Sequence, residues 1–208
     1  MLTRLKQKIQ GLLAAEARIA YEAGLTPNKI TIVGFILALL SAVAYANWGY
    51  NKFFLLLATV LLLFSGFCDA LDGVVARLYG QTTVFGGFLD SVLDRYADAA
   101  VYIGILIGGL WEPRYWGMYW GILAIVGSLL VSYTRARAEA AGIKMESIGF
   151  AERAERMLIL IVASLVALFF QPTIVMTVAL IVLAVITHFT VLQRVFYVYA
   201  KLEKKVAG

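Results

Sequence analysis

The sequence predicts an all-α integral membrane protein: a bundle of six transmembrane helices preceded by an amphipathic interfacial helix. Hydrophobic residues make up 62% of the 208 residues, more than the roughly half that is usual in soluble domains. Charged residues make up only 15%, and they lie in clusters between long apolar runs. A helix needs roughly 20 mostly apolar residues to cross a bilayer, and six segments meet that length.

Residues 1–24 form the first predicted element. Apolar residues recur there at helical spacing, with basic residues between them; these apolar residues are Leu2, Leu5, Ile9, Leu12 and Leu13. The pattern predicts an amphipathic helix at the membrane surface. A solvated helix that packs on its own domain is the alternative. Lys6 and Lys8 interrupt the apolar stretch that a signal peptide would need. Gly24 can end this helix, and Thr26-Pro27 can begin the next.

Residues 25–208 are predicted to form one membrane domain. The spans are expected at about 28–47, 53–78, 83–109, 115–139, 153–171 and 173–200. Short polar turns separate several of them, and the tryptophans lie near span ends, as in an aromatic belt. The one cysteine, Cys68, excludes an internal disulfide framework.

The basic residues predict the orientation of the domain. With six spans, nearly all of the 18 lysines and arginines fall on the side of the two termini, against Lys52 and Arg114 on the other side. The positive-inside rule therefore predicts a multi-pass cell-membrane protein with both termini in the cytoplasm. Because these residues flank apolar segments and form no single stripe, the net charge of +5 does not indicate a nucleic-acid partner.

Five of the 13 acidic residues fall within or beside the second and third spans: Asp69, Asp72, Asp90, Asp94 and Asp98. Residues three or four apart share one face of a helix, so Asp69 faces the same way as Asp72, and Asp90 the same way as Asp94. A short cytoplasmic turn joins the two helices and brings both pairs to one interface. Four convergent carboxylates repel one another unless cations lie among them, and oxygen ligands favour Mg²⁺, Mn²⁺ or Ca²⁺.

Small residues and one arginine accompany these carboxylates. Gly73, Ala76 and Gly86 leave room for a bulky group to approach the backbone, and Arg77 offers a positive charge to a phosphate. The alternative is structural: small residues let helices pack closely, and Arg77 then only neutralises an aspartate.

The run Asp69-x2-Asp72-Gly73-x2-Ala76-Arg77, followed by eight residues and Gly86-x3-Asp90-x3-Asp94, resembles the signature of the CDP-alcohol phosphotransferases. All eight fixed positions are present at the family's spacing. The motif covers about 26 residues, and the family's six-helix arrangement covers nearly the whole chain. The resemblance implies transfer of a phosphoryl-bearing lipid moiety from a CDP-alcohol to a hydroxyl acceptor, with release of CMP. It also implies a homodimer.

The resemblance also implies roles for the residues. Asp69, Asp72 and Asp90 would be the main ligands of two divalent ions, Mg²⁺ or Mn²⁺. Asp94 would be the general base beside the acceptor hydroxyl and would also contact a metal. The CDP-lipid would be bound by Asp69 and Asp72 together with the small residues and the arginine of the motif: Gly73, Ala76, Arg77 and Gly86. Asp98 lies outside the motif and is interpreted as an internal polar contact without a chemical role.

The acceptor must be sought outside the motif. Residues 132–139 end the fourth span and residues 151–156 begin the fifth, both on the side of the aspartates. Spacing of four predicts the pairs Arg135–Glu139 and Glu152–Arg156. The basic residues predicted to bind a phosphate on the acceptor are Arg137, Arg153, Arg194 and Arg135. As an alternative, they are ordinary positive-inside flanking residues.

The loop segments resemble those of phosphatidylinositol phosphate synthases and their archaeal counterparts, which implies inositol 1-phosphate as acceptor and a diacyl or archaeol CDP-lipid as donor. Glycerol 3-phosphate is the alternative acceptor. A membrane transporter would also bury carboxylates, but it would be expected to show broken helices and paired repeats, and the sequence contains no such repeat.

Overall fold

The structure is a computed structural model that describes residues 13–110, 116–145 and 148–206. Within those ranges every regular element is a helix. In chain order they are α2 (Ala14–Glu22), α3 (Pro27–Tyr45), α4 (Lys52–Leu78), α5 (Val84–Ile105) with a π-helical extension η1 (Leu106–Leu110), α6 (Gly117–Ala140), α7 (Arg153–Phe169) and α8 (Pro172–Val206).

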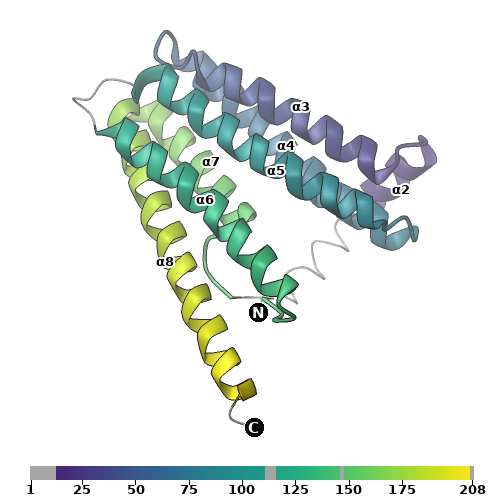
Figure 1. The fold of residues 1–208 in the computed structure, drawn as a ribbon. Coiled ribbons are helices and arrows are strands. Elements are labelled where there is room, and N and C mark those ends of the chain that lie inside the picture. The colour runs from purple at the N-terminus through teal and green to yellow at the C-terminus, as the bar shows by residue number, and fades with distance from the viewer. Residues whose placement is uncertain (1–12, 111–115, 146–147, 207–208) are drawn as a thin grey trace.

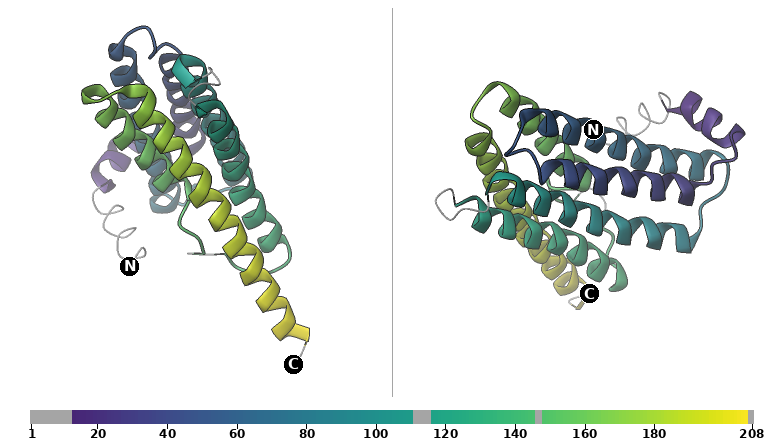
Figure 2. Two further views of the ribbon diagram at one scale, coloured as in Figure 1. Left: turned by 90° about the vertical axis from the view of Figure 1, so that its left-hand side faces the viewer. Right: turned by 90° about the horizontal axis from the view of Figure 1, so that it is seen from above.

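The helices form two packed groups. In the first, α3 lies between α4 and α5 and packs against both (Figures 1 and 2). In the second, α8 packs against α6 and α7, and α7 joins the groups by its contact with α4. The C-terminal part of α8 extends past the other helices (Figure 2). The beginning of α7 therefore lies where both groups can reach it.

Helices α3 to α8 occupy the six predicted ranges. Four of them, α3, α4, α6 and Pro172–Glu203 of α8, are long and apolar enough to cross a membrane. The other two differ for physical reasons: α7 has only 17 residues, and α5 carries the charges of Asp90, Asp94, Arg95 and Asp98. The chain is thus an all-helical membrane protein, and the count of six spans stays a prediction.

Side-chain caps fix where the helices near the aspartates begin. Thr26 accepts a hydrogen bond from the Lys29 amide at 3.4 Å, and Pro27 opens α3, as the sequence predicts. Thr83 caps α5 in the same way by accepting from the Gly86 amide at 2.9 Å. These caps fix where α3 and α5 begin, and hence where along each helix the residues of the first turns lie.

The third predicted span ends differently from expectation. The α-helical pattern stops at Ile105 and continues as a π-helix to Leu110. The indole Nε1 of Trp48 donates to the Ile105 carbonyl oxygen at 3.0 Å at this transition. Gly108 and Gly109 lie so close to Trp48 that a Cβ on either would overlap the ring. Close packing against the α3–α4 turn therefore accompanies the π-helical segment.

The N-terminal helix α2 docks on the end of α4. Ala17 and Ala20 are buried with Leu71, Val74 and Val75, and the Tyr21 ring stacks on the Tyr79 ring at a centroid distance of 3.8 Å. Most of the predicted amphipathic helix, residues 1–12, lies outside the described residues. Its position at a membrane surface stays a prediction.

Candidate active site

Three aspartates from two helices meet at one point. Asp69 of α4 and Asp90 and Asp94 of α5 each offer a carboxylate oxygen, and these oxygens lie within 4.8 Å of one another. The three side chains line a small cavity of about 10 Å³, so their carboxylates can contact a bound ion or water together. The sequence spacing placed each pair on one helix face, and the structure shows that the two faces meet.

Asp72 lines the same cavity but stands slightly apart. Only 8% of this residue is exposed, and the Thr31 hydroxyl of α3 lies 2.6 Å from its Oδ2 oxygen as a donor. Gly34, one turn after Thr31, allows this contact because a Cβ there would lie 2.9 Å from the Cβ of Cys68. The contact of Thr31 with Asp72 was not predicted from the sequence. Its only signal was a hydroxyl in the second turn of an apolar span.

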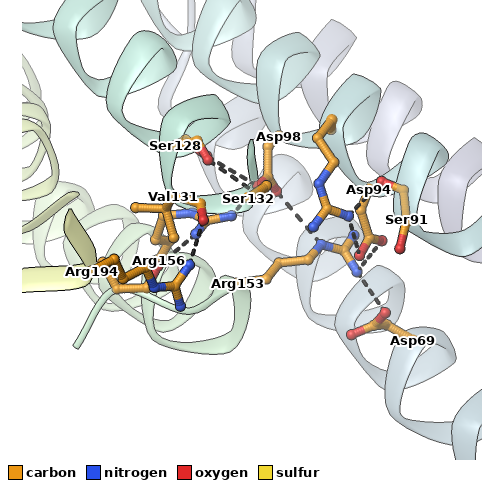
Figure 3. A network of polar contacts seen from close by, with 12 residues as sticks. Asp69, Ser91, Asp94, Asp98, Ser128, Val131, Ser132, Arg153, Arg156 and Arg194 are labelled. Atoms are coloured by element: carbon orange, nitrogen blue, oxygen red, sulfur yellow. Dashed lines mark hydrogen bonds and ion pairs between the residues drawn. The ribbon is translucent and has the colours of Figure 1, made fainter. Parts of the chain in front are cut away.

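Arg153, at the first turn of α7, reaches into the aspartate group. Its Nη1 lies 2.7 Å from Asp69 Oδ1 and 2.6 Å from Asp94 Oδ1, and its Nε lies 3.6 Å from Asp98 Oδ1 (Figure 3). The side chain is only 16% exposed. The sequence left Arg153 without a local partner because its partners lie on α4 and α5.

The donor set fits a divalent metal ion. Asp69, Asp90 and Asp94 supply only carboxylate oxygens, which are the ligands that Mg²⁺ and Mn²⁺ prefer. The contacts of Arg153 also show that the Asp69 and Asp94 oxygens are accessible to a positive charge. Asp72, on the wall of the same cavity, is within reach as a further ligand.

The predicted CDP-lipid residues lie on the adjoining turns. Gly86 is where α5 meets α3, since a Cβ there would lie 2.9 Å from both the Asn28 and the Thr83 side-chain oxygens. On α4, the exposed guanidinium of Arg77 lies over Gly73, 3.2 Å from the position of a Cβ. Ala76 lies between Gly73 and Arg77 in the sequence and is partly buried. The small residues therefore accommodate neighbouring side chains: Arg77 at Gly73, and Asn28 and Thr83 at Gly86.

A much larger cavity, of about 930 Å³, adjoins the aspartates. It is lined by residues of α5, α6, α7 and α8, among them the arginines Arg95, Arg135, Arg153, Arg156 and Arg194. Asp90, Asp94 and Arg153 line both this cavity and the small one. The two cavities thus meet at these three residues.

The structure brings three of the four predicted acceptor arginines to this cavity and leaves out the fourth. Arg135, Arg153 and Arg194 line it, whereas Arg137 is exposed and does not. Arg194 is 1% exposed, and two of its three nitrogens donate to backbone carbonyls: Nε to Ile148 at 2.9 Å and Nη1 to Val131. Arg194 therefore also ties α8 to α6.

One predicted ion pair is confirmed and one is wrong. Arg135 Nε lies 2.9 Å from Glu139 Oε1, as the spacing predicts. Arg156 does not pair with Glu152. Its Nη2 donates to Asp98 Oδ2 at 2.5 Å, and its Nη1 donates to the Ala151 carbonyl at 2.6 Å. The reason is burial: Arg156 is 4% exposed and faces α5, where Asp98 lies.

Comparison with known proteins places these features in a family context. Residues 24–192 match the family model described as CDP-alcohol phosphatidyltransferase. The chain is 37% identical to archaetidylinositol phosphate synthase of Pyrococcus horikoshii, over 98% of this chain and 99% of the relative. It is 43% identical to the synthase of the same name from Methanothermobacter thermautotrophicus, over 89% of each chain.

Solved structures show the same fold. Mycobacterium tuberculosis phosphatidylinositol phosphate synthase with CDP-DAG bound superposes with a TM-score of 0.76 at 31% identity, covering 89% of this chain and 92% of the other. The same protein in complex with manganese and citrate gives a TM-score of 0.77 at 32% identity, covering 89% and 88%.

Proposed function

The chain belongs to the CDP-alcohol phosphatidyltransferase family, and from this premise we propose that it transfers a phosphatidyl-type moiety, diacyl or archaeol, from a CDP-lipid to a hydroxyl of inositol 1-phosphate. CMP is the leaving group. The observation that carries the proposal is the junction of the two cavities: a carboxylate cluster suited to metal ions opens directly onto an arginine-lined cavity suited to a phosphorylated acceptor. Two relatives, which match 98% and 89% of this chain, are named archaetidylinositol phosphate synthase.

The residues of the site have separate roles in the proposed reaction. Asp69, Asp72, Asp90 and Asp94 would hold two Mg²⁺ or Mn²⁺ ions, which neutralise the diphosphate and stabilise the charge that develops on CMP. Gly73, Ala76, Arg77 and Gly86 bind the CDP part of the donor. An acceptor hydroxyl that enters from the large cavity meets Asp94 at the junction. Its oxygen attacks the lipid-bearing phosphorus, its proton passes to Asp94, and the bond to CMP breaks.

The acceptor's own phosphate is bound by the arginines of the large cavity. Arg135 and Arg153 offer guanidinium groups there, and Arg194 has donors left beside its two carbonyl contacts. Arginine suits phosphate because its planar fork can donate two parallel hydrogen bonds. Free inositol carries no charge and therefore gains nothing from these charges.

The membrane arrangement follows the same proposal. Helices α3 to α8 form a six-span domain over residues 25–208, and residues 1–24 lie along the membrane surface. Both termini and the active site face the cytoplasm, which the distribution of lysine and arginine supports. A homodimer is proposed on the family resemblance alone.

The reaction is tested by an acceptor panel. Purified protein is given a labelled CDP-lipid, Mg²⁺ and, in separate reactions, inositol 1-phosphate, glycerol 3-phosphate, free inositol or serine, and CMP release is measured. We expect the fastest release with inositol 1-phosphate. If the enzyme prefers glycerol 3-phosphate, the proposed arginine site still holds, but the acceptor of the reaction is a different molecule. Equal use of free inositol would contradict the proposed phosphate site.

The arginine site is tested by two neighbouring residues of α6. Arg135 lines the large cavity and Arg137 does not, so Arg135→Ala should raise the KM for inositol 1-phosphate roughly tenfold, the lower end for a lost charge-assisted contact. Arg135→Lys should recover part of the loss because it keeps the charge without the fork. The KM for the CDP-lipid should stay unchanged.

Arg137→Ala is the matched control, since it removes the same group two residues away. It should leave both KM values unchanged. Equal increases in the two variants would show that the basic residues act only through general surface charge.

A further inference from the structure

Asp98 is a buried carboxylate that the family motif does not include. It lies one turn beyond Asp94 on α5, and its side chain is 13% exposed. Oδ2 accepts from Arg156 Nη2 at 2.5 Å and from the Ser128 hydroxyl at 3.3 Å, and Oδ1 faces Arg153 Nε at 3.6 Å (Figure 3). A carboxylate in an apolar helix is costly unless it is paired. Two arginines on α7 provide that pairing here: Arg156, which is buried, and Arg153, which is partly buried.

Asp98 contacts Arg153 from the side opposite to the aspartate cluster. Figure 3 shows the Arg153 side chain extending between Asp98 and the Asp69–Asp94 pair. Asp98 faces the Nε end of the guanidinium group, while Nη1 points to Asp69 and Asp94. Because Arg153 lines both cavities, a contact at Nε leaves the Nη groups directed at the junction where donor and acceptor meet.

We propose that Asp98 is a positioning residue for the acceptor: its carboxylate forms an ion pair with Arg153, 3.6 Å from Nε, and so keeps this side chain at the junction of the two cavities, where the Nη groups can be shared between the aspartates and the phosphate of the incoming acceptor. Arg156 contributes to the stability of this arrangement. It fixes the other oxygen of Asp98 and ties it, through the Ala151 carbonyl, to the segment that leads into α7. This inference rests on the proposed function, because it needs a phosphate-bearing acceptor.

A purely structural role makes a different prediction. If Asp98 only balances the buried charge of Arg156, then removing both charges together should restore everything that removing one of them disturbs. Replacing a whole buried ion pair by groups of similar size is often neutral, whereas breaking it leaves an uncompensated charge. Stability and acceptor binding therefore separate the two roles when they are measured in the same variants.

The experiment compares Asp98→Asn, Arg156→Met and the double variant in the full-length protein. Melting temperature, kcat, and KM for CDP-lipid and for inositol 1-phosphate are measured for each. We expect both single variants to melt earlier and the double variant to regain the wild-type melting temperature. Asp98→Asn and the double variant should both keep a roughly tenfold higher KM for the acceptor, with the KM for the CDP-lipid unchanged. Arg156→Met should change the acceptor KM much less.

A second comparison shows whether Asp98 acts through Arg153. In an Arg153→Lys background, Asp98→Asn should add little to the acceptor KM, because residues that act as one unit are not additive. Recovery of the acceptor KM together with the melting temperature in the double variant would overturn the inference, as would fully additive effects in the Arg153→Lys background. If Asp98→Asn alone does not fold, the charge-balanced double variant still decides the question. Failure of the proposed function would appear separately, as a wild type that does not prefer a phosphorylated acceptor.

Discussion

Asp90→Asn is expected to reduce turnover by more than roughly 100-fold, because a neutral amide is a much weaker ligand for a hard dication than a carboxylate. Asp90 is one of the three residues whose carboxylate oxygens lie within 4.8 Å of one another. Asp69→Asn should reduce turnover in the same way. Asp72→Asn should do so as well, although Asp72 is not one of these three residues. Calorimetric titration with Mn²⁺ should show weakened binding in the variant, independently of any assay of activity.

Chelation is the complementary test. EDTA should abolish CMP release by the wild type, and Mg²⁺ or Mn²⁺ in excess should restore it. Glu22→Gln is a suitable control for the aspartate variants, because it also converts a carboxylate to an amide but affects only the exposed pair with Arg18 on α2. Wild-type activity in the presence of EDTA would refute the metal mechanism.

Local features of the sequence predicted most of the fold. The apolar runs located α3 to α8, and the Thr26-Pro27 pair marked the start of α3. Such features depend on residues within one or two turns of each other. The motif spacing likewise placed each aspartate pair on one helix face, and the short connection between α4 and α5 made their convergence predictable.

Long-range partners could not be predicted in this way. The exposed pair Arg135–Glu139 obeys the rule of four, because both residues lie on one accessible helix face. Arg156 breaks the same rule because its side chain is buried against another helix, where the stronger partner is Asp98. Arg153 also pairs with an aspartate far away in the sequence, Asp94. Thr31 likewise donates to Asp72, which lies on another helix. Only the packing of α3 and α7 on α4 and α5 reveals these contacts.

Two of the predicted acceptor arginines, Arg135 and Arg137, lie in different surroundings in the structure. Arg135 and Arg137 are two residues apart, so their side chains leave the helix in directions about 200° apart. The sequence predicts acceptor binding for both, and for Arg137 this stays a prediction. The structure shows that Arg135 lines the large cavity while Arg137 is exposed elsewhere.

Asp94 differs from the other aspartates of the cluster in its surroundings. Its Oδ1 lies 2.6 Å from Arg153 Nη1, and its Oδ2 lies 3.5 Å from Arg95 Nη1. The side chain is 16% exposed and lines the large cavity as well as the small one. A carboxylate at this junction can accept a proton from a hydroxyl that arrives through the large cavity, while Asp69 and Asp72 border only the small one. Asp90 also borders both cavities, so the ion pairs with Arg153 and Arg95 are what set Asp94 apart.

Asp94→Asn should therefore lower kcat by about 100- to 10,000-fold, the usual contribution of a general base, and should leave most of the affinity for the CDP-lipid intact. Asp90→Asn is the matched control: it makes the same change one turn earlier on α5 and should weaken binding of both metal and CDP-lipid. Equilibrium binding of a labelled CDP-lipid in Mg²⁺ and single-turnover CMP release measure the two effects separately. If Asp94→Asn loses CDP-lipid binding as completely as Asp90→Asn, then Asp94 is chiefly a metal ligand, and another group must take the proton of the acceptor.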